Sequence, residues 1–177
     1  LINGIAYFSG GRTSSAKSIK ELWAYDIVND SWQQKNDLPF GARWRSASAT
    51  QNNKGYLLFG MDENNRYCNE LFEYDPLADS WTQVTAFPGI GRIYTSILSF
   101  SNELVFLAGF DSFATNYNDM WRINLSTLNW QQLSSIPASG RRGGMCFNSG
   151  SAIYYTTGVD DTAHRIKETW KIDNPTG

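Results

Sequence analysis

The sequence predicts an all-β fold made of repeated four-stranded sheets, and an internal repeat is the main observation behind this prediction. Trp32, Trp81 and Trp130 are spaced by 81 − 32 = 49 and 130 − 81 = 49 residues. Other registers keep the same step without an insertion: Gly11, Gly60, Gly109 and Gly158; Pro39, Pro88 and Pro137; Arg43, Arg92 and Arg141. Self-similarity at a fixed period is the signature of a repeat architecture.

The composition agrees with this class and excludes several others. The chain has 177 residues, of which 41% are hydrophobic and 15% aromatic, and no apolar run approaches the length of a membrane span. A formal net charge of −2 argues against nucleic acid as the main partner, because there is no basic excess. Two cysteines, Cys68 and Cys146, and one histidine give no metal-ligand spacing, so we expect no metal and no cofactor. The state of the two thiols stays open.

The second copy of the repeat shows four short strands, named a to d. They are expected at residues 46–50, 56–59, 71–74 and 81–84. The turns between a and b and between c and d carry Asn, Asp, Gly and Pro, which are the residues that tight turns favour. A polar stretch of nine residues, 61–69, joins strands b and c.

Four short antiparallel strands at a period near 50 are typical of a β-propeller blade. One such sheet cannot bury both of its faces, whereas blades stacked around an axis bury them continuously. Trp23 and its equivalents Phe72, Trp121 and Trp170 are expected to fill the blade interfaces together with the strand d tryptophans.

At the level of motifs, the chain resembles the kelch family of propellers. The kelch motif has Gly-Gly closing strand b, a tyrosine on strand c and a tryptophan some residues later, and Gly10-Gly11, Tyr25 and Trp32 match it. The later copies depart from it: Phe59, Ala108 and Thr157 replace the first glycine, and Ile123 and Ile172 replace the tyrosine. The resemblance implies the fold but not one function, since kelch propellers include scaffolds, adhesion modules and enzymes.

The chain holds about 3.6 kelch-like repeats of 49 residues, in one domain over residues 1–177. The repeat units are expected at 1–43, 44–92, 93–141 and 142–177, the first and last incomplete. Because propellers have 4–8 blades, we expect a fragment of a six- or seven-bladed propeller, as part of a larger multidomain chain or surface complex.

Strand topology predicts which end of the blades carries function. In an antiparallel a-b-c-d sheet the b–c and d–a loops emerge at the same end. The four b–c loops, residues 12–20, 61–69, 110–118 and 159–167, keep their length but differ in sequence. A regular scaffold below variable loops of fixed length is typical of a binding surface.

Candidate ligand-binding residues lie in these loops. The repeated arginines and their neighbours enter from the d–a loops, and two further candidates come from the b–c loops: Arg43, Trp44, Arg92, Tyr94, Arg141, Arg142, Arg66 and Tyr117. The arginines could form a ring of guanidinium groups for carboxylate or phosphate, and the kelch resemblance implies capture of acidic peptides by such arginines. Alternatively, an arginine repeated at one register is part of the blade architecture, which we favour for each single arginine. Trp44, Tyr94 and Arg142 are then the better ligand candidates, and aromatic rings beside arginine also suit a sugar.

Asp62, Asp111 and Asp160 follow the repeated glycine by two residues. A calcium site needs several oxygens converging on one point, whereas these lie one per blade, so we expect them to cap turns.

The sequence therefore predicts a non-enzymatic module that recognises a protein or glycan through the b–c and d–a loops. The alternative is a carbohydrate-active kelch propeller, similar to a sugar mutarotase or oxidase, with catalytic residues partly outside this chain. Oxidases of this fold use two histidine ligands, and only His164 is present. The turn sequences resemble secreted or surface-anchored bacterial kelch proteins, so an extracellular or cell-surface location is expected.

Overall fold

The computed structural model describes residues 1–15 and 17–173, and these residues form antiparallel sheets without any helix. Accordingly, no helix in the described residues is long and apolar enough to cross a membrane. The all-β prediction and the four-sheet organisation are confirmed.

Four sheets follow one another along the chain, and each repeat contributes one of them. The first is β1 (Ile5–Ser9), β2 (Leu22–Asp26) and β3 (Ser31–Lys35). The second is β4 (Ala47–Gln51), β5 (Lys54–Leu58), β6 (Glu70–Asp75) and β7 (Ser80–Ala86), and the third is β8 (Ser96–Phe100), β9 (Glu103–Phe110), β10 (Asn116–Asn124) and β11 (Trp130–Leu133). The fourth is β12 (Met145–Asn148), β13 (Ala152–Thr156) and β14 (Thr169–Asp173).

The strands predicted in the second copy are confirmed, with ends shifted by a few residues. Strand b begins at Lys54 and ends at Leu58 rather than Phe59. Phe59 leaves the strand because its φ of 66° is left-handed, a conformation that ends regular pairing.

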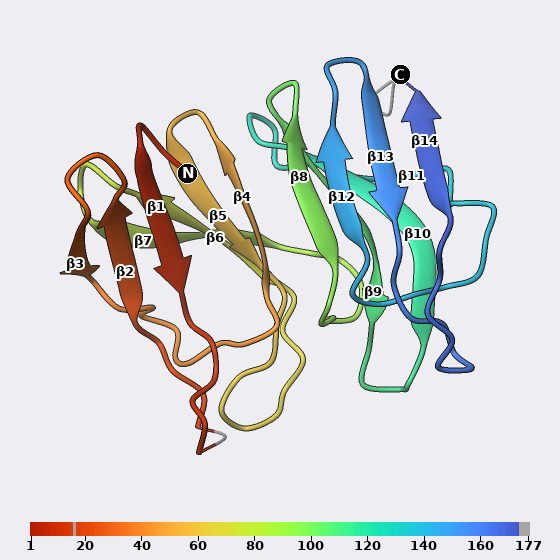
Figure 1. Ribbon diagram of the computed structural model, residues 1–177, viewed down its shortest axis with the longest axis horizontal. Helices are drawn as coiled ribbons and strands as arrows, with labels where there is room; N and C mark the ends of the chain where they lie inside the picture. Colours follow the sequence, from red (N-terminus) through yellow and green to blue (C-terminus); the bar gives the residue numbers. More distant parts are fainter. Residues whose placement is uncertain (16, 174–177) are drawn as a thin grey trace.

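The sheets pack face to face, with their first strands innermost. Figure 1 shows β4, β8 and β12 side by side in the middle of the molecule, and β8 contacts both of the others. Between the second and third sheets, Phe87 is the centre of an aromatic cluster. Its ring packs edge-on against Phe59, Phe106, Trp121 and Trp130, with centroid distances of 5.5, 5.1, 5.0 and 5.4 Å. Edge-to-face contacts at these distances stabilise beyond the area they bury.

The residue before the repeated glycine adopts the same unusual conformation in every copy, just after strand b in three of them and at a pairing irregularity inside β9 in the third. Gly10, Phe59, Ala108 and Thr157 have φ of 62°, 66°, 62° and 63°. For residues other than glycine this left-handed conformation costs on the order of 1–2 kcal/mol. Phe59 and Ala108 are buried at 1% and 0% exposure, so packing offsets their strain. Thr157 is exposed and β-branched, and no comparable packing offsets its strain.

We therefore predict that Thr157→Gly stabilises the protein by about 1 kcal/mol, because glycine adopts this φ without strain. Chemical denaturation would show a higher midpoint. The control is Thr156→Gly, one residue earlier in β13, which should lower the midpoint because glycine weakens a strand. A lower midpoint for Thr157→Gly would contradict the strain argument.

Candidate binding face

One arginine per repeat ties neighbouring sheets together. The Arg92 carbonyl accepts a hydrogen bond from Gly60 N of the preceding sheet at 2.8 Å. Its side chain turns back into its own sheet, where Nη1 and Nη2 donate to the two carboxylate oxygens of Asp119 at 2.6 and 2.7 Å. Nη1 also donates to the carbonyl of Ala108 at 3.1 Å. This bidentate, charge-assisted pair holds the segment before strand a against strand c of the same sheet.

The other two repeats use the same device. Arg43 pairs with Glu70 and Arg141 with Glu168, and their carbonyls accept from Gly11 N and Gly109 N. The side chains of Arg43, Arg92 and Arg141 are buried, at 2%, 3% and 1% residue exposure. These contacts agree with the architectural interpretation of the repeated arginines. A binding surface at this end of the sheets would therefore have to come from their neighbours.

Two residues after each of these arginines, the chain forms the inner rim of the face, defined here as Arg45, Tyr94 and Gly143. All three have left-handed φ, of 57°, 56° and 67°. Hydrogen bonds link them from sheet to sheet, since Tyr94 N donates to the Arg45 carbonyl at 3.4 Å and Gly143 N to the Tyr94 carbonyl at 3.0 Å. The rim precedes β4, β8 and β12, and so lies at the inner end of each sheet.

A stack of alternating arginines and aromatic rings lies on this rim. The Arg45 guanidinium carbon lies 3.7 Å from the Trp44 ring centroid and 4.5 Å from that of Tyr94. Arg12, from the first b–c loop, lies 4.2 Å from the Trp44 centroid. Backbone pairing of Trp44 with Met61 joins this segment to the second b–c loop, which places the two loop types at the same end of the sheets.

The remaining sequence candidates lie apart from this stack. The Arg142 guanidinium carbon lies 4.7 Å from the Phe110 centroid, and Nη1 donates to Asn116 Oδ1 at 3.2 Å. Arg66 is exposed and donates to Asp62 and Glu70. Tyr117 donates its hydroxyl to Asp111 and lies beneath the Arg92 guanidinium, whose central carbon is 3.7 Å from the ring centroid. The structure thus brings Trp44 and Tyr94 together through Arg45, and leaves Arg142, Arg66 and Tyr117 in separate contacts.

The three aspartates after the repeated glycine cap the b–c loops, as predicted. Asp111 Oδ1 accepts from Phe113 N and Thr115 N at 2.9 and 3.0 Å, and Asp62 and Asp160 make equivalent backbone contacts. Burial raises the pKa of Asp111, but the bonds from Thr115, Tyr117 and Phe113 outweigh it and hold this pKa below its usual range. Burial and the Asp111 bond raise the pKa of Tyr117 to about 12. Among the described residues, no three His, Cys, Asp or Glu side chains converge to hold a metal ion.

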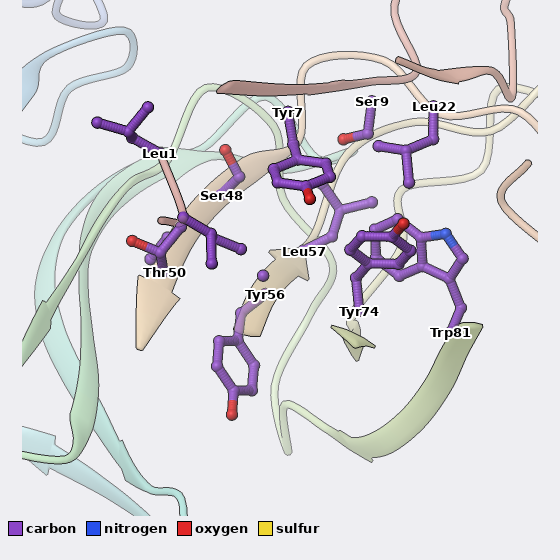
Figure 2. Close-up of a pocket in the computed structure, with 13 residues that line it drawn as sticks. Leu1, Tyr7, Ser9, Leu22, Ser48, Thr50, Tyr56, Leu57, Tyr74 and Trp81 are labelled. Carbon is purple, nitrogen blue, oxygen red and sulfur yellow. The ribbon is translucent and has the colours of Figure 1, made fainter. Parts of the chain in front are cut away.

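Two hollows accompany the face. One of about 700 Å³ lies between residues 17–21 and the connection at 37–42, on the same side as the b–c loops, with Glu63 at its edge. The other, of about 230 Å³, lies between the first and second sheets. Figure 2 shows Tyr7 and Ser9 on one side of it and Tyr74 and Trp81 on the other. Its lining side chains are apolar or carry hydroxyl groups, so it is a packing gap between blades rather than a charged site.

Comparison with known proteins gives the family. The model of the KLHDC2/KLHL20/DRC7 Kelch-repeats domain matches residues 1–176. The chain belongs to the kelch-repeat family. Among solved structures it is similar to the one titled "Structure of YjhT", with a TM-score of 0.80 and 15% sequence identity. The match covers 97% of this chain and 64% of that chain, so this kelch domain spans less than two thirds of its structural relative. No curated protein matches the sequence.

Sequence reasoning places Arg45 beside the repeated arginines but does not select it, or Arg12, as a ligand candidate, although both lie in the stack. Arg45 lies at a register where Tyr94 and Gly143 stand in the other copies, so a search for repeated residues passes over it. The signal that could have found it is the rim position itself, two residues after the repeated arginine.

We predict that Arg92→Leu destabilises the kelch domain by about 3–5 kcal/mol, because it leaves the Asp119 carboxylate buried without its partner. The double variant Arg92→Leu/Asp119→Leu should recover part of this loss, which equilibrium denaturation would measure. Equal losses in the single and double variants would show that the charge pair is not the cause.

The lowered pKa of Asp111 predicts acid sensitivity. A carboxyl group with a folded-state pKa below its unfolded value, about 3.9, contributes stability above that value and loses it as pH falls through the folded pKa. Asp111→Asn should therefore cost about 1–3 kcal/mol at pH 7 and progressively less below about pH 4. Denaturation curves at several pH values test this, with exposed Glu63→Gln as control. A cost independent of pH would refute it.

Proposed function

We propose that this kelch domain is a non-enzymatic module that binds a protein partner through its inner rim, with a partner carboxylate on Arg45. Kelch domains generally bind protein partners. The observation that carries the proposal is the environment of Arg45, which is half-buried and whose guanidinium carbon lies over the rings of both Trp44 and Tyr94.

Stacking leaves the hydrogen-bonding edge of a guanidinium group available, because the rings occupy only its faces. Within the described part of the chain Arg45 forms no ion pair, in contrast to the carboxylate-paired Arg43, Arg92 and Arg141. A preordered, uncompensated guanidinium edge suits bidentate contact with a carboxylate.

The same stack favours a protein over a glycan. A sugar ring binds against a free aromatic face, whereas Trp44 has Arg12 at 4.2 Å and Arg45 at 3.7 Å from its centroid. The carbohydrate-active alternative gains no comparable support, since His164 contacts Thr162 in the fourth b–c loop, apart from the rim. An extracellular or cell-surface location belongs to the proposal and needs a localisation experiment.

The test uses fluorescent peptides rich in Asp and Glu, with matched Asn and Gln peptides, in anisotropy titrations. We predict tighter binding of the acidic peptides and a loss of at least about tenfold in Arg45→Ala, with partial retention in Arg45→Lys, which keeps the charge but loses the planar fork. Trp44→Ala/Tyr94→Ala should also lose binding, because Arg45 is then no longer held in place.

The control is Leu77→Ala, at a residue 98% exposed on the turn between β6 and β7 at the opposite end of the sheet. Thermal unfolding of every variant separates lost binding from lost folding. Unchanged affinity in the folded Trp44→Ala/Tyr94→Ala variant would reject this face. Preference for neutral oligosaccharides over acidic peptides would reject the carboxylate and favour a glycan.

A further inference from the structure

Two buried polar groups without a protein partner lie in the junction between the third and fourth sheets. Arg141 is 1% exposed and Tyr155 is 0% exposed. Within the described residues, Arg141 Nη1 and the Tyr155 hydroxyl have no hydrogen-bond partner. Leaving a buried polar group unpaired costs about 1–3 kcal/mol, so such groups in native proteins nearly always bind something.

The two groups belong to the same small region. The Arg141 guanidinium carbon is 5.9 Å from the Tyr155 ring centroid, and its positive charge acts on the hydroxyl, partly opposing the burial that raises the pKa of Tyr155. The hydroxyl lies against Gly144, where a Cβ atom would come within 2.5 Å of it.

A side-chain hydroxyl group occurs in this region of both the third and the fourth repeat. Tyr155 and Gly144 correspond to Phe106 and Thr95 in the third repeat, since 155 − 49 = 106 and 144 − 49 = 95. In the fourth repeat the hydroxyl group belongs to Tyr155, which lies beside Gly144. In the third repeat it belongs to Thr95, and Phe106 has no hydroxyl group. Thr95 Oγ1 also has no partner among the described residues, and neither has Nε of the repeat's own Arg92.

The surroundings favour a neutral occupant. Arg141 is already paired with Glu168, so little positive charge remains for an anion. Burial raises the pKa of the neighbouring Cys146 thiol to about 12, so that group is neutral.

We infer that an ordered water molecule binds in this junction, accepting a hydrogen bond from Arg141 Nη1 and bonding to the Tyr155 hydroxyl. A buried water needs two to four polar partners, and these two groups supply the first two. The water extends the arginine pair of the fourth sheet toward the start of its inner strand.

A high-resolution crystal structure of this chain tests the site directly. A solvent peak at hydrogen-bond distance, about 2.7–3.2 Å, from both Arg141 Nη1 and the Tyr155 oxygen is expected. A direct bond from either group to protein atoms, or an empty junction, would overturn the inference. Crystals soaked in bromide distinguish a halide, because an anomalous peak at this place would replace the water with an anion.

Stability provides a second, independent test. If the water is present, Tyr155→Phe removes one of its partners, and the equilibrium constant for unfolding should rise about threefold to tenfold. If the hydroxyl is merely unpaired, its removal should leave that constant unchanged or lower it. Tyr154→Phe, one residue earlier and only half-buried, is the matched control and should change it little.

Exchanging side chains between the third and fourth repeats provides a third test. Gly144→Thr alone should destabilise strongly because of the contact with Tyr155, whereas Gly144→Thr/Tyr155→Phe reproduces the third repeat and should recover most of the loss. In crystals of the double variant the solvent peak should remain, now bound to the threonine hydroxyl. Its disappearance would contradict the inference.

Discussion

The structure depends on the buried arginine that precedes the inner strand of the second, third and fourth sheets. Its carbonyl binds the glycine that closes strand b of the preceding sheet, and its guanidinium group binds a carboxylate at the start of strand c in its own sheet. A buried ion pair by itself is weak evidence for stability, because desolvation offsets much of the Coulomb attraction. Its better-supported role is geometric. Arg92 joins two sheets at one point, because its carbonyl binds the preceding sheet and its guanidinium fork binds its own sheet. Arg43 and Arg141 join their sheets in the same way, with a single contact to Glu70 and to Glu168.

At other registers the repeats preserve an interaction between two side chains rather than the identity of either residue. In the second sheet Lys54 donates to Glu73, and at the same registers of the third sheet Arg122 donates to Glu103, with the charges exchanged. Arg12 beneath Trp44 at one junction corresponds to Phe110 beneath Arg142 two junctions later. Such exchanges keep the interaction while changing both of its members, so they are invisible when single positions are compared.

This explains how far the sequence could be interpreted. The period, the strand order, the end of the sheets that carries the variable loops and the capping aspartates all follow from residues that repeat exactly, and the structure has them. The repeat boundaries and the ligand residues stay predictions. Burial of Arg43, Arg92 and Arg141 was one of two open interpretations, because an arginine at exact register is compatible with a ring of ligands or with a structural tie. The contacts with Glu70, Asp119 and Glu168 favour the structural interpretation of these arginines.

Arg45 was not among the candidates because its register does not repeat and its backbone conformation leaves no mark in the sequence. The left-handed φ at the rim cannot be seen in a register occupied by arginine, tyrosine and glycine, of which only glycine signals it. Phe59 is a second example. A phenylalanine within an apolar run predicts a strand residue, yet tertiary packing holds Phe59 outside the strand.

The hydrogen-bonded rim has a consequence for how such a domain diversifies. Backbone bonds between sheets hold the main chain at Arg45, Tyr94 and Gly143 in one left-handed conformation, although three different side chains stand there. Glycine alone adopts this conformation without strain, so arginine or tyrosine at the rim costs stability that glycine does not. Under the proposed function, the recognition chemistry of the rim would therefore change one blade at a time, and each gain in side-chain chemistry would be set against this strain.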